Sequence, residues 1–177
     1  MSSSALDLTF GVELEFTVCT LPSSSVDPDP HDPRSPFGIT KAENSSVRPE
    51  ESHKVFDLDL SDWDEHNLDL MESTQAHIAN TLRSNGIAAR SQLAENLKGM
   101  EEQANQSADL SWWITEDCTV KGPTGGYSKD YTYIPIEIQS PPLRFVPSSV
   151  THVEKVASHL CTTYRIITNE TCGYHCQ

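Results

Sequence analysis

The sequence predicts an α+β fold, because two kinds of hydrophobic periodicity occur in separate parts of the chain. Apolar and polar residues alternate over residues 8–18 and again over 131–139, which is the pattern of a half-buried β-strand. Apolar residues recur at helical spacing over 150–164, which indicates an amphipathic helix. The length of 177 residues suits one domain, which we place at residues 6–177.

The first predicted strand, residues 8–18, carries two glutamates on one face. Its apolar side chains occupy the even-numbered positions, so Glu13 and Glu15 project together from the opposite face. Two like charges about 7 Å apart repel by about 2 kcal/mol at an effective dielectric constant near 20. A divalent cation would relieve this repulsion, whereas on an open sheet face both carboxylates would simply be hydrated.

The next stretch has the composition of a disordered insertion, which we place at residues 20–54. It is rich in Pro, Ser and Asp, and these residues do not supply a buried apolar face. The acidic residues 50–72 follow, and within them the alternation at 56–60 fits either an edge strand or a solvated loop.

The middle of the chain predicts helices and then strands. A helix is expected over 73–85, ending at Asn85-Gly86, and residues 91–110 fit a mostly solvent-facing helix or a mobile segment. A strand begins at Trp112 and ends near Val120, before a Gly-rich turn at 122–126. The strand at 131–139 again places an acidic residue, Glu137, on the face opposite its aliphatic side chains.

Pro141-Pro142 ends that strand, and the strongest amphipathic helix follows. A side-chain oxygen of Ser148, Ser149 or Thr151 is expected to cap its first turn, and residues 165–168 predict a further strand. The expected apolar face of this helix consists of Val150, Val153, Val156, Leu160, Cys161 and Tyr164.

Composition excludes some partners. The formal net charge is −14, which argues against nucleic acid and favours cationic ligands or metal ions. The five cysteines are odd in number and irregularly spaced, and the N-terminus lacks the pattern of a signal peptide, so we expect a cytoplasmic protein with reduced thiols. No apolar run is long enough to predict a membrane span.

Three predicted strands share an aliphatic face backed by acidic residues. Glu13 and Glu15 belong to the first of these strands, Asp117 to the second and Glu137 to the third. Together with His175, they describe a sheet face lined by oxygen and imidazole groups, which can hold divalent cations against nucleotide phosphates.

Four motifs in order resemble the amidoligase family, a branch of the carboxylate–amine ligases related to glutamine synthetase and glutamate–cysteine ligase. They are FGVELEF at 10–16, WITEDCT at 113–119, IEIQSPPL at 136–143 and NETCGYH at 169–175. The resemblance implies a glutamine synthetase-like curved antiparallel sheet, here incomplete, with helices on one face and an ATP–Mg²⁺ site on the other.

The family's reaction forms an amide from a carboxylate and an amine through an acyl phosphate. The resemblance implies small-molecule or peptide substrates and ATP and Mg²⁺ as cofactors. Glu13, Glu15 and Glu137 would hold the metal or ATP–metal, and His175 would contact phosphate or metal. Asp117, acting with Glu137 in catalysis, would orient a metal or the incoming amine.

The chain departs from the family pattern after His175, where a second histidine and a long C-terminal half are expected. We therefore expect an N-terminal fragment of weak or no activity, with an unpaired sheet edge that makes self-association possible. A noncatalytic binding or regulatory remnant and a metal-dependent hydrolase remain alternatives. The basic residues near the acidic motifs in sequence are Lys121, Lys129, Arg144 and Arg165.

Overall fold

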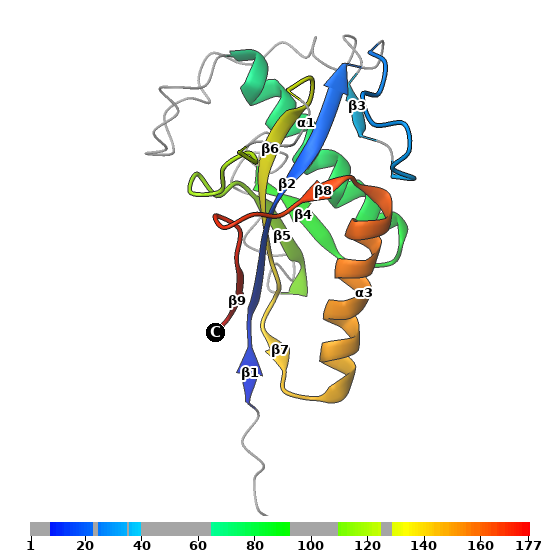
Figure 1. The fold of residues 1–177 in the computed structure, drawn as a ribbon. Helices are drawn as coiled ribbons and strands as arrows, with labels where there is room; N and C mark the ends of the chain where they lie inside the picture. Colours follow the sequence, from blue (N-terminus) through cyan, green and yellow to red (C-terminus); the bar gives the residue numbers. More distant parts are fainter. Residues whose placement is uncertain (1–7, 23–24, 35, 40–64, 93–109, 125–128) are drawn as a thin grey trace, which may run out of the picture.

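The computed structural model describes residues 8–22, 25–34, 36–39, 65–92, 110–124 and 129–177. Within these residues the chain forms a curled mixed sheet of seven strands, a separate two-stranded ribbon and two helices (Figure 1). The predicted α+β class is confirmed.

The central strand of the sheet is β2 (Val12–Pro22), which pairs along both of its edges. On one edge it runs antiparallel to β6 (Thr132–Gln139), and beyond β6 lie β5 (Trp112–Thr115) and β4 (Ala89–Ser91). Three short strands share its other edge: β3 (Phe37–Ile39), β8 (Ile166–Ile167) and β9 (Tyr174–Cys176).

The sheet is mixed, which corrects the expectation of an antiparallel one. Strand β3 runs parallel to β2, and β4 runs parallel to β5. Each parallel pair is joined by a connection far longer than a hairpin turn, because the chain must return to the same end of the sheet before it pairs. Alternation within a strand reports which face is buried and carries no information about the direction of its neighbour.

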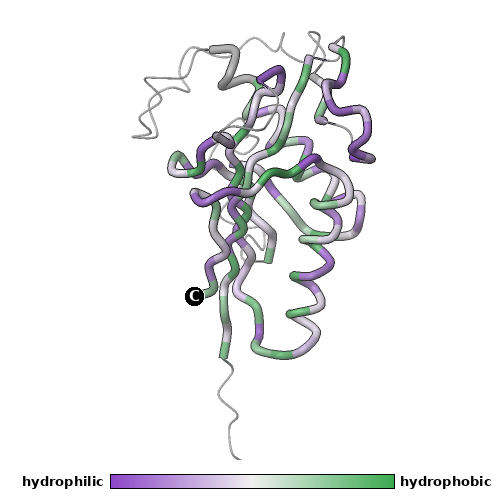
Figure 2. The backbone as a smooth tube through the Cα atoms, in the orientation of Figure 1, coloured by the Kyte–Doolittle hydropathy of each residue, from purple (hydrophilic) through white to green (hydrophobic). Residues whose placement is uncertain are grey.

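The helices α1 (Glu65–Ser84) and α3 (Pro147–Thr163) cover one face of the sheet. Apolar and polar residues alternate along β2 and β6 (Figure 2), and the apolar set of each strand packs against the helices. The fully buried side chains at this interface include Ile78, Leu82, Val156, Val18, Ile134, Ile136 and Ile138. The opposite face of the sheet is therefore left to the polar positions of the strands.

Helix α1 begins at Glu65, eight residues before the predicted start, and ends at Ser84 as the Asn85-Gly86 signal indicates. Gly86 has φ 74°, the left-handed conformation that glycine adopts without strain after a helix. Strand β5 ends at Thr115 instead of near Val120, because the chain turns back at Asp117, whose carbonyl accepts a hydrogen bond from the amide of Val120 at 3.1 Å.

The predicted side-chain cap of α3 is wrong. The N-cap residue is Val146, which makes no side-chain hydrogen bond, and Pro147 opens the helix. Proline favours the first helical position because its φ is already helical and it has no amide hydrogen to leave unsatisfied. Ser148 and Ser149 consequently lie inside the first turn. Val150 and Cys161, two of the six predicted apolar positions, are exposed.

The predicted disordered insertion at 20–54 is not confirmed. Strand β2 continues through Pro22, and a buried arginine, Arg165, holds part of the segment that follows. Its guanidinium donates to both carboxylate oxygens of Asp27 at 2.9 Å and to the carbonyl of Arg34 at 2.7 Å. Residues 40–54, the possible strand at 56–60 and most of the helix predicted at 91–110 lie outside the described residues.

The ribbon consists of β1 (Thr9–Phe10) and β7 (Leu143–Arg144), which pair antiparallel. Of the helices in the described ranges, neither combines the length and the apolar character needed to cross a membrane.

Candidate functional site

The strand register gathers the predicted site residues on the face of the sheet away from the helices. Glu13 of β2 lies opposite His175 of β9 on one side and opposite Gln139 of β6 on the other. Glu15 lies opposite Glu137. Directly paired residues project from the same face of a sheet, so these side chains share one surface.

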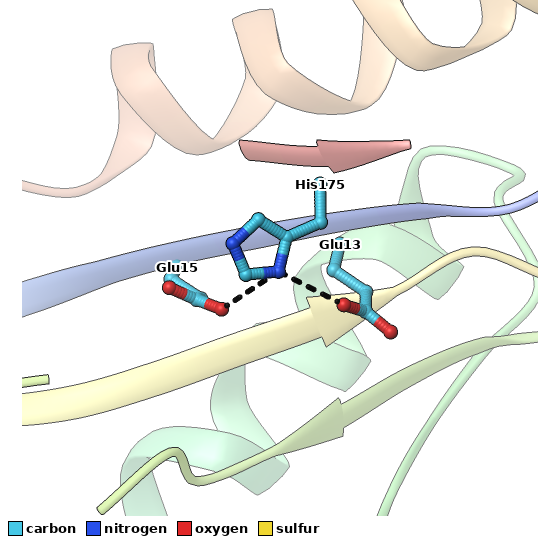
Figure 3. Close-up of side chains that lie close together, drawn as sticks. All are labelled: Glu13, Glu15 and His175. Carbon is cyan, nitrogen blue, oxygen red and sulfur yellow. Dashed lines mark hydrogen bonds and ion pairs between the residues drawn. The ribbon is translucent and has the colours of Figure 1, made fainter. Parts of the chain in front are cut away.

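Glu13, Glu15 and His175 form a compact cluster, which we call the acidic triad. The Nδ1 atom of His175 lies 3.3 Å from Oε2 of Glu13 and 3.4 Å from Oε1 of Glu15 (Figure 3). One ligand atom from each residue can be chosen so that all three lie within 4.8 Å of one another. The side chain of Glu15 is 7% exposed, that of Glu13 22% and that of His175 54%, so the triad opens to solvent on the side of the histidine.

Backbone contacts of β9 bring the triad together. The amide of Glu15 donates to the carbonyl of Gly173 at 3.0 Å, and Gly11 and Gln177 exchange two further hydrogen bonds at 3.0 and 3.1 Å. The absence of a side chain at Gly173 leaves room for the triad. A Cβ there would lie only 2.6 Å from Oε2 of Glu15 and 2.7 Å from Nε2 of His175. The glycine therefore allows carboxylate and imidazole to meet.

Glu137 stands beside the acidic triad on the neighbouring strand. Its Oε1 atom accepts a hydrogen bond from the side-chain amide (Nε2) of Gln139 at 3.0 Å. Burial raises the pKa of Glu137 above its ordinary value, the Gln139 hydrogen bond partly opposes that shift, and the charges of Glu13, Asp117 and Glu15 add to it. Glu137 is thus a carboxylate whose ionisation is disfavoured unless a cation lies close to it.

Asp117 lies outside the acidic triad. Its Oδ1 atom accepts hydrogen bonds from the backbone amide and the hydroxyl of Thr119, both at 2.7 Å, and so closes the turn after β5. This is the ordinary turn-forming role of an aspartate. Its negative charge is nevertheless one of the causes of the raised pKa of Glu137.

The comparison with protein families decides the assignment of this chain. A family model described as "putative amidoligase enzyme" matches residues 6–177. The chain belongs to the amidoligase family. No curated protein and no solved structure matches it. The match contains every residue of the acidic triad, together with Glu137 and Asp117, and family membership supports a ligase-type function.

The donor set of this amidoligase fits a divalent cation. Carboxylate oxygens are the preferred ligands of Mg²⁺ and Mn²⁺, and a neutral imidazole completes many sites for Mn²⁺ and heavier metals. The acidic triad supplies two carboxylates and one imidazole, and Glu137 offers a third carboxylate on the adjacent strand. The family resemblance implies that Glu137 holds the metal and that His175 contacts phosphate or metal, and in the structure His175 is the residue that clusters with Glu13 and Glu15.

Two of the basic residues singled out in the sequence, Arg165 and Lys121, bind other groups in the amidoligase fold. Arg165 is buried among residues 27–34, Arg144 belongs to the ribbon, and Lys121 donates to the carbonyl of Cys118 at 2.7 Å. Lys129 is exposed on the turn before β6.

Arg90 is the functional candidate that the sequence did not reveal. It lies on β4 opposite Trp113, and its guanidinium carbon is 4.7 Å from the centre of the indole ring. Strand β4 has only three residues, too few for alternation to reveal which face Arg90 would occupy.

Proposed function

We propose that this protein is an ATP- and Mg²⁺-dependent carboxylate–amine ligase that activates a small-molecule or peptide carboxylate as an acyl phosphate and transfers the acyl group to an amine. The observation that carries the proposal is the acidic triad, in which Glu13, Glu15 and His175 converge across two strands of an amidoligase-family chain. In a glutamine synthetase-like site the nucleotide would bind on the face of the sheet away from the helices, and the acidic triad lies on that face.

The triad would hold the metal ion, and a bound Mg²⁺ would supply charge neutralisation for the phosphates. Glu15 is held most firmly, since it is buried and its amide is bonded to Gly173. His175 is the most exposed member and faces the side from which a ligand would enter. The protein's contribution is to position charged groups before the substrates arrive.

Glu137 would act in the second step of the reaction, in which the amine attacks the acyl phosphate. An amine is protonated in water and must lose a proton to form an amide, so a nearby base is required. Glu137 lies on the strand beside the acidic triad, opposite Glu15, and its carboxylate would accept that proton. Asp117, fixed by its bonds to Thr119, would orient the incoming amine.

Calorimetry tests the nucleotide site directly. We expect the 177-residue chain to bind a non-hydrolysable ATP analogue in the presence of Mg²⁺ and not in its absence. Glu13→Gln and Glu15→Gln should each abolish this binding, whereas Glu154→Gln, on the exposed side of α3, should leave it unchanged. Metal binding without nucleotide binding would favour a metal-dependent hydrolase, and a folded chain that binds neither would favour a noncatalytic remnant.

Hydroxylamine trapping tests the chemistry without knowledge of the amine. An acyl phosphate reacts with hydroxylamine to give a hydroxamate and inorganic phosphate, so a panel of carboxylates can be screened for ATP-dependent hydroxamate. We expect at least one carboxylate to give product with the unmodified chain and none to do so with Glu15→Gln. ADP release without hydroxamate, for every carboxylate, would contradict acyl phosphate formation.

A further inference from the structure

A row of side chains crosses the open face of the sheet from β9 to β4. The strand register pairs His175 with Glu13, Glu13 with Gln139, Gln139 with Trp113, and Trp113 with Arg90. Since each residue is directly opposite the next, all five project from the same surface. The row starts in the acidic triad and ends in a cation.

The cation at the end of the row is the guanidinium of Arg90, and the indole of Trp113 supports it. The guanidinium of Arg90 lies over the indole of Trp113, with 4.7 Å between its central carbon and the ring centre. Both residues are partly exposed, so the pair forms part of the surface and not of the core. An arginine stacked in this way loses little further rotamer freedom when it binds an anion, and its planar donors suit phosphate oxygens.

The spacing sets the size of the anion. Strands lie about 4.8 Å apart, so a guanidinium above β5 is about 10 Å from β2, two strands away. A single phosphate or carboxylate cannot reach both a metal ion in the acidic triad and Arg90, whereas an oligophosphate chain can. The two positions directly between them hold the uncharged residues Gln139 and Trp113, and the carboxylate of Glu137 beside them accepts a hydrogen bond from the Gln139 side chain.

We propose that Arg90, supported by Trp113, binds the end of the nucleotide's oligophosphate chain that is remote from the metal ion in the acidic triad. This inference rests on the proposed function, because the triad must hold the metal. Arg90 is then a binding residue, and Trp113 is a positioning residue that supports its guanidinium.

Inorganic tripolyphosphate is a suitable probe, because it carries the charge of the nucleotide without its base. We would titrate the full chain first with Mn²⁺ alone and then, at saturating Mn²⁺, with tripolyphosphate and separately with glutarate, a dicarboxylate. Arg90→Gln should leave the Mn²⁺ dissociation constant within twofold and weaken tripolyphosphate binding at least about tenfold. Lys155→Gln removes the same charge from α3 and should change neither constant.

Two further variants separate charge from geometry. Arg90→Lys keeps the charge without the planar fork and should recover only part of the lost affinity. Trp113→Leu keeps the arginine without its support and should weaken tripolyphosphate binding while Mn²⁺ binding is preserved. This second variant also tests the pair if Arg90→Gln fails to fold, which its thermal unfolding profile would reveal.

The outcomes distinguish the two proposals. If the unmodified chain binds Mn²⁺ and tripolyphosphate and Arg90→Gln binds both equally well, the role of Arg90 is overturned while the ligase proposal stands. If Arg90→Gln weakens glutarate binding and not tripolyphosphate binding, Arg90 serves a substrate carboxylate and the phosphate assignment is wrong. If the unmodified chain binds no Mn²⁺, the proposed function fails, and the inference fails with it.

Discussion

The carboxylate of Glu15 occupies the space that a side chain on Gly173 would need. The amide of Glu15 also donates a 3.0 Å hydrogen bond to the carbonyl of Gly173, so the two backbones are held at this separation. A Cβ at position 173 would lie 2.6 Å from Oε2 of Glu15, well inside van der Waals contact. The atoms that would have to move are the ends of the Glu15 and His175 side chains, not the backbone.

Gly173→Ala should therefore damage the acidic triad more than the fold. We expect the affinity for Mn²⁺ to fall at least about tenfold, or about 1.4 kcal/mol, while thermal stability changes little. Titration calorimetry and thermal unfolding measure the two effects. Gly11→Ala is the matched control, since a Cβ there meets nothing within 4 Å. Equal metal affinity in both variants would show that the close approach at Gly173 is not needed.

The raised pKa of Glu137 predicts a pH dependence of stability. The folded state holds the Glu137 proton more tightly than the unfolded state, so metal-free stability should fall as the pH rises from about 4.5 through the range in which Glu137 ionises. Glu137→Gln removes this contribution and should gain about 0.5 kcal/mol at pH 7, a small amount because the side chain is partly exposed.

Urea unfolding of the unmodified chain and of Glu137→Gln, at several values between about pH 5 and pH 8, measures this contribution. Glu154→Gln serves as the control for loss of a surface charge. Added Mg²⁺ should cancel the advantage of Glu137→Gln, because a cation favours the ionised form. A variant that remains more stable at saturating Mg²⁺ would contradict a role for Glu137 at the metal.

The contact between Arg165 and Asp27 predicts loss of structure in acid. The hydrogen bonds from Arg165 are the largest cause that lowers the Asp27 pKa from 3.8 to about 2. The stability this contributes is present above pH 3.8 and is lost as the pH falls towards 2.

Arg165→Met should remove that acid dependence and lower the melting temperature by about 5–10 °C, because the carboxylate and carbonyl groups that the buried guanidinium binds lose their partner. It should also expose residues 27–34 to proteolysis at neutral pH. Thermal unfolding and limited proteolysis followed by mass spectrometry measure both. Protection of this segment equal to that in the unmodified chain would show that other contacts, such as those of the Tyr131 hydroxyl with Asp27 and Asp29, are enough to hold it.

The uncapped start of α3 predicts a stabilising substitution. Val146 is exposed at the N-cap position and makes no side-chain bond to the first turn, and that turn contains no acidic residue. Val146→Asp should raise the free energy of unfolding by about 1 kcal/mol through a side-chain cap and the helix dipole. Val146→Ala, which removes the apolar surface without adding a cap, should not. Equal urea midpoints for the two variants would contradict the capping argument.

The two long strands could be predicted from the sequence because each alternates over many residues. That alternation correctly separates Glu13, Glu15 and Glu137 from the side chains that face the helices. The same pattern cannot reveal strand order, since hydrogen bonding between strands depends on backbone groups common to all residues. The contact between His175 and Glu13 spans 162 positions and depends on that order.

Other features were missed because their causes are not local. The closeness of Gly173 to Glu15 depends on the pairing of two distant strands, and the strand of Arg90 is too short to have a period. The Pro-rich segment has a composition typical of disorder, yet part of it is ordered by one buried arginine that lies more than a hundred residues later. Composition measures what a segment can bury by itself and does not account for a partner elsewhere in the chain.

The pairing of β2 along both edges also has a kinetic consequence. Its partners include β3, which follows it closely, and β6 and β9, which come much later, so folding must close long loops before those contacts form. Such non-local topology slows folding. The Glu13–His175 contact, across 162 positions, requires nearly the whole chain to be in place. A metal ion that binds there would therefore report completion of the native state, and the rate at which metal affinity appears during refolding would time the last step of assembly.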